Sequence, residues 1–176
     1  MLVVQAAISG LAVLVTFLIA RRLAGATVAW VAALLIAIEP ALVYYDVTRI
    51  HPLGLQTLLL SLVVLAFLRL LSAPSGSTTF LAGFATGMAI YERGTPIVFA
   101  PVGLIFAMAS HRTRRLPWLR MVMIFVIGAA VVLSPWIVRN YRVYGRFILV
   151  MTADPELLWI GNNPNATGLL VTGSGK

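Results

Sequence analysis

The segment from Glu39 to Pro52 gathers most of the groups that could do chemistry in this chain. In fourteen residues it holds two carboxylates, Glu39 and Asp46, together with the guanidinium of Arg49, the imidazole of His51 and two phenols. A carboxylate or imidazole can act as a general base, and a guanidinium can bind a phosphate. The alternative is an ordinary polar loop with tyrosines at the membrane interface.

A second charged group stands in the sequence YERGTP, between two short apolar runs. Charges placed in or beside a membrane are expensive, so Glu92 and Arg93 are candidates for a functional role. The planar fork of Arg93 suits a phosphate, because it can donate to two oxygens at once. The alternative is a local salt bridge with Glu92 in the wet headgroup layer.

Two more segments near the C-terminus carry candidate groups. PWIVRNYRVYGRF, residues 135–147, combines aromatic side chains with three arginines, of which Arg139 is a candidate phosphate ligand. LLWIGNNPNATG follows, where Asn162 and Asn163 can hydrogen-bond sugar hydroxyls and Trp159 can stack on a sugar ring. The alternatives are an interfacial anchor for the first segment and an Asn-Pro turn for the second.

Composition shows which solvent positions these groups. The 176 residues are 61% hydrophobic and only 10% charged, with a mean hydropathy of +1.00. Such a chain has too few charges to cover a water-facing surface, so we expect an integral membrane protein. It has no cysteine, no metal-ligand spacing and no recognisable nucleophile–base pair, so no metal or cofactor is expected. The net charge of +8 comes from arginine clusters between apolar runs, which is typical of membrane topology rather than of nucleic-acid binding.

The apolar runs predict an all-α, polytopic membrane helix bundle of about six transmembrane segments, residues 1–138, followed by a short polar tail, residues 139–176. One helix over residues 79–109 would be roughly 45 Å long and would bury the ERG sequence in the bilayer, so a hairpin is expected there. The six expected segments are Leu2–Ala20, Thr27–Tyr45, Leu53–Leu71, Thr79–Tyr91, Thr95–Ala109 and Met121–Val138.

If six segments alternate across the membrane, three arginine groups fall on one side: Arg21-Arg22, Arg69 and the Arg112–Arg120 cluster. The positive-inside rule assigns this side to the cytoplasm. The tail and all five acidic residues then lie on the outer side. We therefore predict one outer cavity lined by Glu39, Asp46, Arg49, His51, Glu92 and Arg93.

The two C-terminal segments also resemble a family. Members of the C-type membrane glycosyltransferases, in the branch of protein O-mannosyltransferases and lipid A aminoarabinose transferases, often read P-W-x-x-R-N-Y-x-x-x-G, then a segment ending G-N-N-P-x-A-T-G. Both patterns stand here, at Pro135–Gly145 and Gly161–Gly168. GFATGMAIYERGTPIVFAP and RRLAGATVAWVAALLIAIEPALVYY are similar to further parts of the family pattern.

The resemblance implies an enzyme of the bacterial inner membrane that works at the outer face. Its donor would be a polyprenyl-phosphate-linked sugar, and its acceptor a lipid, a glycan or a protein. Arg93, Arg49 and Arg139 would be the candidates for the donor phosphate. The acceptor hydroxyl would need a carboxylate base.

The chain departs from the family pattern in two places. In the family, a first helix and a large outer loop with the catalytic acidic residue precede the region resembled here. Members also usually carry an acidic residue just before the Pro-Leu that opens the next helix, where this chain has His51. We therefore expect a fragment of the fold, with the catalytic residue unassigned among Asp46, Glu39 and His51.

A non-catalytic multi-pass membrane protein, transporter-like or an assembly module, is the competing interpretation. A transporter should place charges near the middle of the bilayer, on broken helices. Here the acidic residues and Arg93 are predicted to gather at one membrane face, which favours the enzyme.

Overall fold

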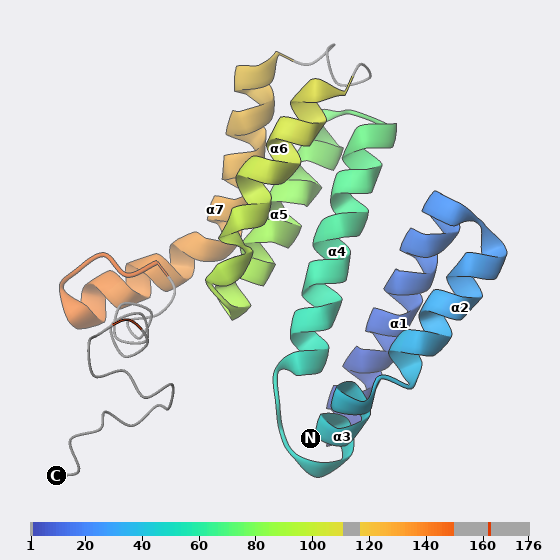
Figure 1. Ribbon diagram of the computed structural model, residues 1–176. Helices are drawn as coiled ribbons and strands as arrows, with labels where there is room; N and C mark the ends of the chain where they lie inside the picture. The colour runs from blue at the N-terminus through green and yellow to red at the C-terminus, as the bar shows by residue number, and fades with distance from the viewer. Residues whose placement is uncertain (1, 111–116, 150–161, 163–176) are drawn as a thin grey trace, which may run out of the picture. The chain divides into compact units, whose positions relative to one another are not determined.

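The computed structural model describes residues 2–110, 117–149 and 162 (Figure 1). The chain forms two compact units, Met1–Pro135 and Trp136–Lys176. The larger unit contains the candidate residues of both charged segments, and the smaller one contains Arg139 and the asparagine segment.

All regular structure in the described ranges is helical, which confirms the all-α fold class. The elements in chain order are α1 (Leu2–Ala24), α2 (Ala26–Ala37), α3 (Pro40–Thr48), α4 (Leu53–Ser72), α5 (Gly76–Glu92), the 3-10 helix η1 (Thr95–Val98), α6 (Phe99–Ala109) and α7 (Trp118–Tyr144).

Burial in α1 is arranged as expected for helices in lipid. Its buried residues are Gln5, Ser9, Ala12 and Val15, which are small or polar and recur every three or four positions. Large apolar side chains such as Leu11 and Leu14 are exposed instead. Small residues let helix backbones approach closely, while lipid is as good a solvent for leucine as the protein interior.

The expected helix over residues 27–45 is broken near its middle. α2 ends at Ala37, α3 begins at Pro40, and the two axes differ by 45°. Proline at this position cannot donate a backbone hydrogen bond, so the first helix ends before it. Glu39 accepts a 2.7 Å hydrogen bond from the Leu42 amide and so caps the new helix.

The expected hairpin over residues 79–109 is confirmed. α5 ends at Glu92, Arg93 is extended, and the chain continues through η1 into α6. Both η1 and α6 pack against α5. The break places Glu92 and Arg93 at a helix end rather than inside a continuous helix.

The count of six transmembrane segments is not confirmed. In the part of the chain that the structure describes, three helices are long and apolar enough to span a bilayer, namely α1, α4 and α7. The bent pair of α2 and α3 would make a fourth, whereas α5 and the η1–α6 segment are shorter. The last helix also differs from the expected segment, since it runs past Val138 to Tyr144.

Glycines allow α5 and α7 to touch backbone to backbone. A Cβ atom added to Gly83 would collide with the carbonyl oxygen of Phe125, and one added to Gly87 would lie 2.9 Å from the Cα of Ala129. On α7, a Cβ atom added to Gly128 would collide with the carbonyl oxygen of Phe80. The GFATG sequence is thus a helix-packing motif of the small-xxx-small type.

The hairpins give the larger unit two distinct ends. One end carries the N-terminus of α1, the turn between α3 and α4, and the break between α5 and η1, and we call it the site end. The other, the opposite end, carries the turn before α2 and the turn between α4 and α5 (Figure 1). Arg21, Arg22 and Arg69 belong to the opposite end, while Asp46 and Glu92 belong to the site end.

The close α5–α7 contact predicts opposite effects for two glycine substitutions. Gly83→Ala should destabilise the chain by about 1–3 kcal/mol, because the obstructing Phe125 atoms are backbone and cannot turn away. Gly10→Ala on α1 is the matched control, because nothing lies within 4 Å of its added Cβ. It should be neutral or stabilise by up to about 1 kcal/mol through helix propensity. Unfolding in mixed micelles with increasing sodium dodecyl sulfate measures both, and equal effects would contradict the packing argument.

Candidate functional site

Gln5 organises the site end. Its side-chain amide, nine-tenths buried, donates to the carbonyl oxygens of Tyr45 and Arg49 at 3.1 and 3.2 Å and to Asp46 Oδ1 at 3.3 Å. Its oxygen accepts a 3.1 Å hydrogen bond from the His51 amide. Two N–H groups serving three acceptors require shared hydrogen bonds, which hold the α3–α4 turn firmly against α1.

His51 is held in place by a ring contact and by a hydrogen bond. Its ring stacks on Tyr45, with centroids 4.1 Å apart and planes 18° from parallel. Its Nδ1 accepts a 3.1 Å hydrogen bond from the Leu53 amide, one of the unpaired donors at the start of α4. This bond requires Nδ1 to be unprotonated, so a neutral ring carries its proton on Nε2 and can donate it to a ligand.

Asp46 lies between α1 and α4, half-buried, with one oxygen hydrogen-bonded to Gln5. It lines a cavity of about 220 Å³ between α1, α2 and α3. Ser9 lines the same cavity, and its buried hydroxyl has no partner among the described atoms. The close approach of α4 depends on Gly54, because a Cβ there would collide with Ser9 Oγ. Asp46 is therefore a held carboxylate beside a partly polar space, which suits a general base.

Arg93 and Glu92 form the second charged group of the site end. Arg93 is exposed and donates from Nη1 to Gln56 Oε1 at 3.3 Å, which ties the end of α5 to the first turn of α4. No salt bridge joins Glu92 and Arg93 within the described part of the chain, although they are neighbours in sequence. The Glu92 Oε2 atom is buried and lacks a hydrogen-bond partner there. The remaining donors of Arg93 are exposed at this end.

The start of α4 contacts both groups of the site end, the one that contains His51 and the one that contains Arg93. His51 stands just before α4, and Gln56, the partner of Arg93, stands in its first turns. Glu39 does not join them, because it caps α3 at the end remote from the turn, roughly 13 Å along a nine-residue helix. Arg49 contributes its carbonyl oxygen to Gln5, and its side chain is exposed. Glu39 therefore lies apart from the other five predicted residues, and a cavity shared by those five stays a prediction.

An apolar cavity of about 310 Å³ opens beside His51. Its lining is largely aliphatic and comes from α1, the α3–α4 turn and the start of α4: Val4, Gln5, Ile8, Ile50, His51, Pro52 and Leu55. Among the described residues that line it, only His51 and Gln5 are polar. An apolar surface with a hydrogen-bond donor at its edge suits a ligand with a hydrocarbon chain and a polar head.

Gln5 is the residue that sequence reasoning missed. It lies in an apolar run that reads simply as a first membrane helix, and its four partners are 40 to 46 residues away. The feature of the sequence that could have indicated this role is that Gln5 is a lone amide in an apolar helix. Such a group must find its partners within the protein.

In the smaller unit, several residues of the P-W-x-x-R-N-Y-x-x-x-G pattern make structural contacts. The Arg139 guanidinium stacks over the Trp136 ring at 4.8 Å and donates to Asn140 Oδ1 at 3.1 Å. Asn140 is buried and donates to the Ile148 carbonyl oxygen at 3.3 Å, which folds the chain back after α7. Gly145 adopts a φ of +66° and ends the helix, a position that favours glycine. These contacts hold the helix end together, and Arg139 remains exposed.

The last candidate residues fall mostly beyond the described ranges. Trp159 and Asn163 lie outside them, and Asn162 is described as exposed. Within the described ranges, no three His, Asp or Glu side chains gather where they could hold a metal ion.

The fold and the site end together define a helical membrane protein with a carboxylate, Asp46, and a guanidinium, Arg93, at one end of apolar helices. The family model for dolichyl-phosphate-mannose-protein mannosyltransferases matches residues 1–138. The chain therefore belongs to this family of membrane glycosyltransferases with the C-type fold. No curated protein and no solved structure matches the chain.

The Gln5 network predicts a structural effect that its neighbour on the same helix does not share. Gln5→Ala should destabilise the chain by about 1–3 kcal/mol, because it leaves the His51 amide and Asp46 without their partner. Ser9→Ala removes a buried hydroxyl with no described partner and should be nearly neutral. Hydrogen exchange should show the His51 amide opening faster in Gln5→Ala only. Unchanged exchange at His51 would contradict the proposed anchoring.

Proposed function

We propose that this protein transfers a sugar from a polyprenyl-phosphate-linked donor to an acceptor hydroxyl at the outer face of a bacterial inner membrane. The family match over residues 1–138 carries this proposal. The acceptor would be a lipid, a glycan or a protein. The arrangement of the site end supports the proposal, because it combines an apolar cavity, a cation and a carboxylate.

Each part of the donor has a counterpart at the site end. The polyprenyl chain would lie along the apolar cavity beside His51. The phosphate would lie near Arg93, whose Gln56 contact occupies only one of its five donors. His51 Nε2–H would be a second donor to the phosphate or the sugar. Arg49 and Arg139, both exposed, are further candidates for the phosphate.

Asp46 is the best-placed candidate for the base. It is held by Gln5 beside a cavity, whereas the Glu39 carboxylate is occupied by the cap of α3. In the proposed reaction the acceptor oxygen attacks the anomeric carbon, and its proton passes to the Asp46 carboxylate. The bond between the anomeric carbon and the phosphate oxygen breaks, and polyprenyl phosphate leaves with the electron pair, its charge stabilised by Arg93.

The role of Asp46 predicts a loss of rate without a loss of donor binding. Asp46→Asn keeps an oxygen that can accept from Gln5 but removes the base, so transfer should fall by about 10²–10⁴-fold. Release of polyprenyl phosphate in proteoliposomes, with short-chain donors and candidate acceptors, measures the rate. Glu39→Gln is the control, which should affect stability more than rate. Full activity in Asp46→Asn would remove Asp46 from the reaction.

The role of Arg93 predicts a loss of donor affinity. Arg93→Ala should weaken binding of a short-chain polyprenyl-phosphate sugar by roughly 1.5–3 kcal/mol, the range for a hydrogen bond to a charged group. Arg93→Lys keeps the charge but not the fork, so its affinity should be intermediate. Gln56→Ala removes only the protein partner of Arg93 and is the matched control. Equal donor affinity in Arg93→Ala and the parent chain would leave Arg93 with a structural role.

The proposed orientation puts the site end outside. The chain has no cysteine, so single cysteines at Thr48 and Ser77 report on the two ends of the larger unit. Both positions are exposed. A membrane-impermeant maleimide should label Thr48→Cys in intact cells and Ser77→Cys only after the membrane is opened. The reverse pattern would place the site end in the cytoplasm and contradict the proposal.

A further inference from the structure

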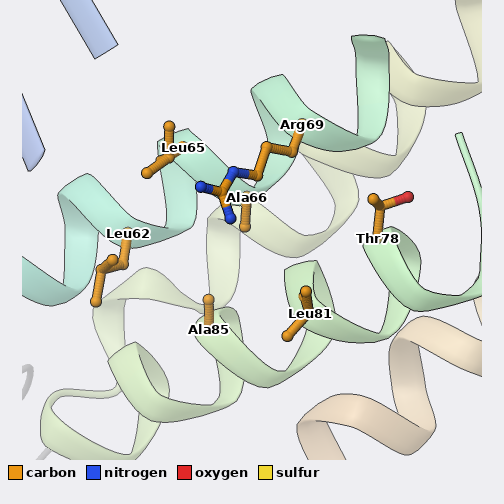
Figure 2. A pocket seen from close by; sticks show the side chains of 7 residues that line it. All are labelled: Leu62, Leu65, Ala66, Arg69, Thr78, Leu81 and Ala85. Atoms are coloured by element: carbon orange, nitrogen blue, oxygen red, sulfur yellow. The ribbon is translucent and has the colours of Figure 1, made fainter. Parts of the chain in front are cut away.

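A second cleft lies between α4 and α5 at the opposite end of the larger unit (Figure 2). Its volume is about 160 Å³, and its lining is aliphatic except for one cation and one hydroxyl. The lining residues are Leu62, Leu65, Ala66, Arg69, Thr78, Leu81 and Ala85. Arg69 is sixteen residues beyond Leu53, so about 24 Å of helix separates this cleft from the start of α4 at the site end.

The Arg69 side chain lies along the cleft. Its guanidinium turns back along α4 and lies over Ala66, towards Leu65 (Figure 2). Arginines near membrane helix ends usually extend towards the interface. Among the described residues no acidic side chain pairs with Arg69, so this cation faces an apolar cleft without an anion of the protein.

The hydroxyl in the cleft does not supply the missing partner. Thr78 Oγ1 is engaged in the capping box at the start of α5, where it receives the Ser75 amide at 2.9 Å. It also contacts the Ala73 and Ser75 carbonyl oxygens at 3.0 and 3.1 Å. The guanidinium of Arg69 is therefore the group of this cleft that is free to bind an anion.

We propose that this cleft binds an anionic phospholipid of the membrane leaflet at the opposite end. Arg69 would hold the lipid phosphate, since its fork matches two phosphate oxygens. One acyl chain would lie along the aliphatic lining from Ala66 to Leu62, which continues for about 6 Å along α4 towards the bilayer centre. Arg21 and Arg22 belong to the same end and add to its positive potential, which attracts anionic lipid.

The occupant is a lipid rather than free phosphate because the cleft offers one cation and an otherwise aliphatic surface. A small dianion would gain the Arg69 contact alone and leave the aliphatic lining uncovered. A phospholipid uses both parts. This site does not depend on the proposed transferase activity, because it lies at the other end of α4.

Native mass spectrometry of the chain tests the site with phosphatidylglycerol and with phosphatidylcholine of the same acyl chains. The parent chain should retain phosphatidylglycerol preferentially. Arg69→Gln should reduce this retention about tenfold or more, the factor for one charge-assisted hydrogen bond. Arg69→Lys should be intermediate, because it keeps the charge without the fork. Arg22→Gln, which removes a charge at the same end but outside the cleft, should change retention little.

Two further measurements distinguish a bound lipid from a bound free anion. Ala85→Leu fills the cleft without changing charge and should also reduce retention, which keeps the test valid if Arg69→Gln does not fold. Inorganic phosphate and the deacylated headgroup, glycerophosphoglycerol, should not displace the lipid at equal concentration. Displacement by either would identify a free-anion site and overturn the proposal. Equal losses in Arg22→Gln and Arg69→Gln, or unchanged retention in Arg69→Gln, would overturn it too.

Discussion

The hydrogen bonding of one buried amide decides how the site end is built. Lipid offers no partner to a polar group, so Gln5 in the apolar helix α1 must be satisfied by the protein itself. It is satisfied by the end of α3 and the α3–α4 turn, which together supply two carbonyl oxygens, a carboxylate and an amide. This arrangement fixes His51 and Asp46 relative to α1. The catalytic candidates are therefore positioned by a side chain whose hydrogen bonds hold the fold together.

Small residues make that arrangement possible. Gly54 admits Ser9 at the α1–α4 contact, and Gly83 admits the backbone of α7 at the contact with α5. Helices in lipid gain little from burying large apolar side chains, so close backbone approach has to supply the packing. The large side chains face outward instead, as Leu11 and Leu14 do. The same close packing brings separate helix ends near enough to share polar groups.

The two ends of the larger unit use arginine differently. At the site end, Arg93 is tied to α4 through Gln56 and keeps exposed donors, which suits a ligand that arrives and leaves. At the opposite end, Arg69 lies back over an aliphatic cleft. In the smaller unit, Arg139 is held by Trp136 and Asn140 and closes a helix end. The neighbours of each guanidinium, rather than the residue type, indicate what it can bind.

The sequence by itself determined the helical membrane class, because composition and the length of apolar runs depend on no tertiary contact. It also predicted the turn after Glu92, since a charged pair between two short apolar runs is a local feature of the sequence. The sequence was a poorer guide to which segments are long enough to cross the bilayer, because the bending and the length of a helix depend on its packing. Only the tertiary structure showed that Gln5 anchors the turn and that Glu39 is a helix cap. These roles depend on contacts across more than 40 residues or on the side chain's own geometry, and a one-dimensional pattern records neither.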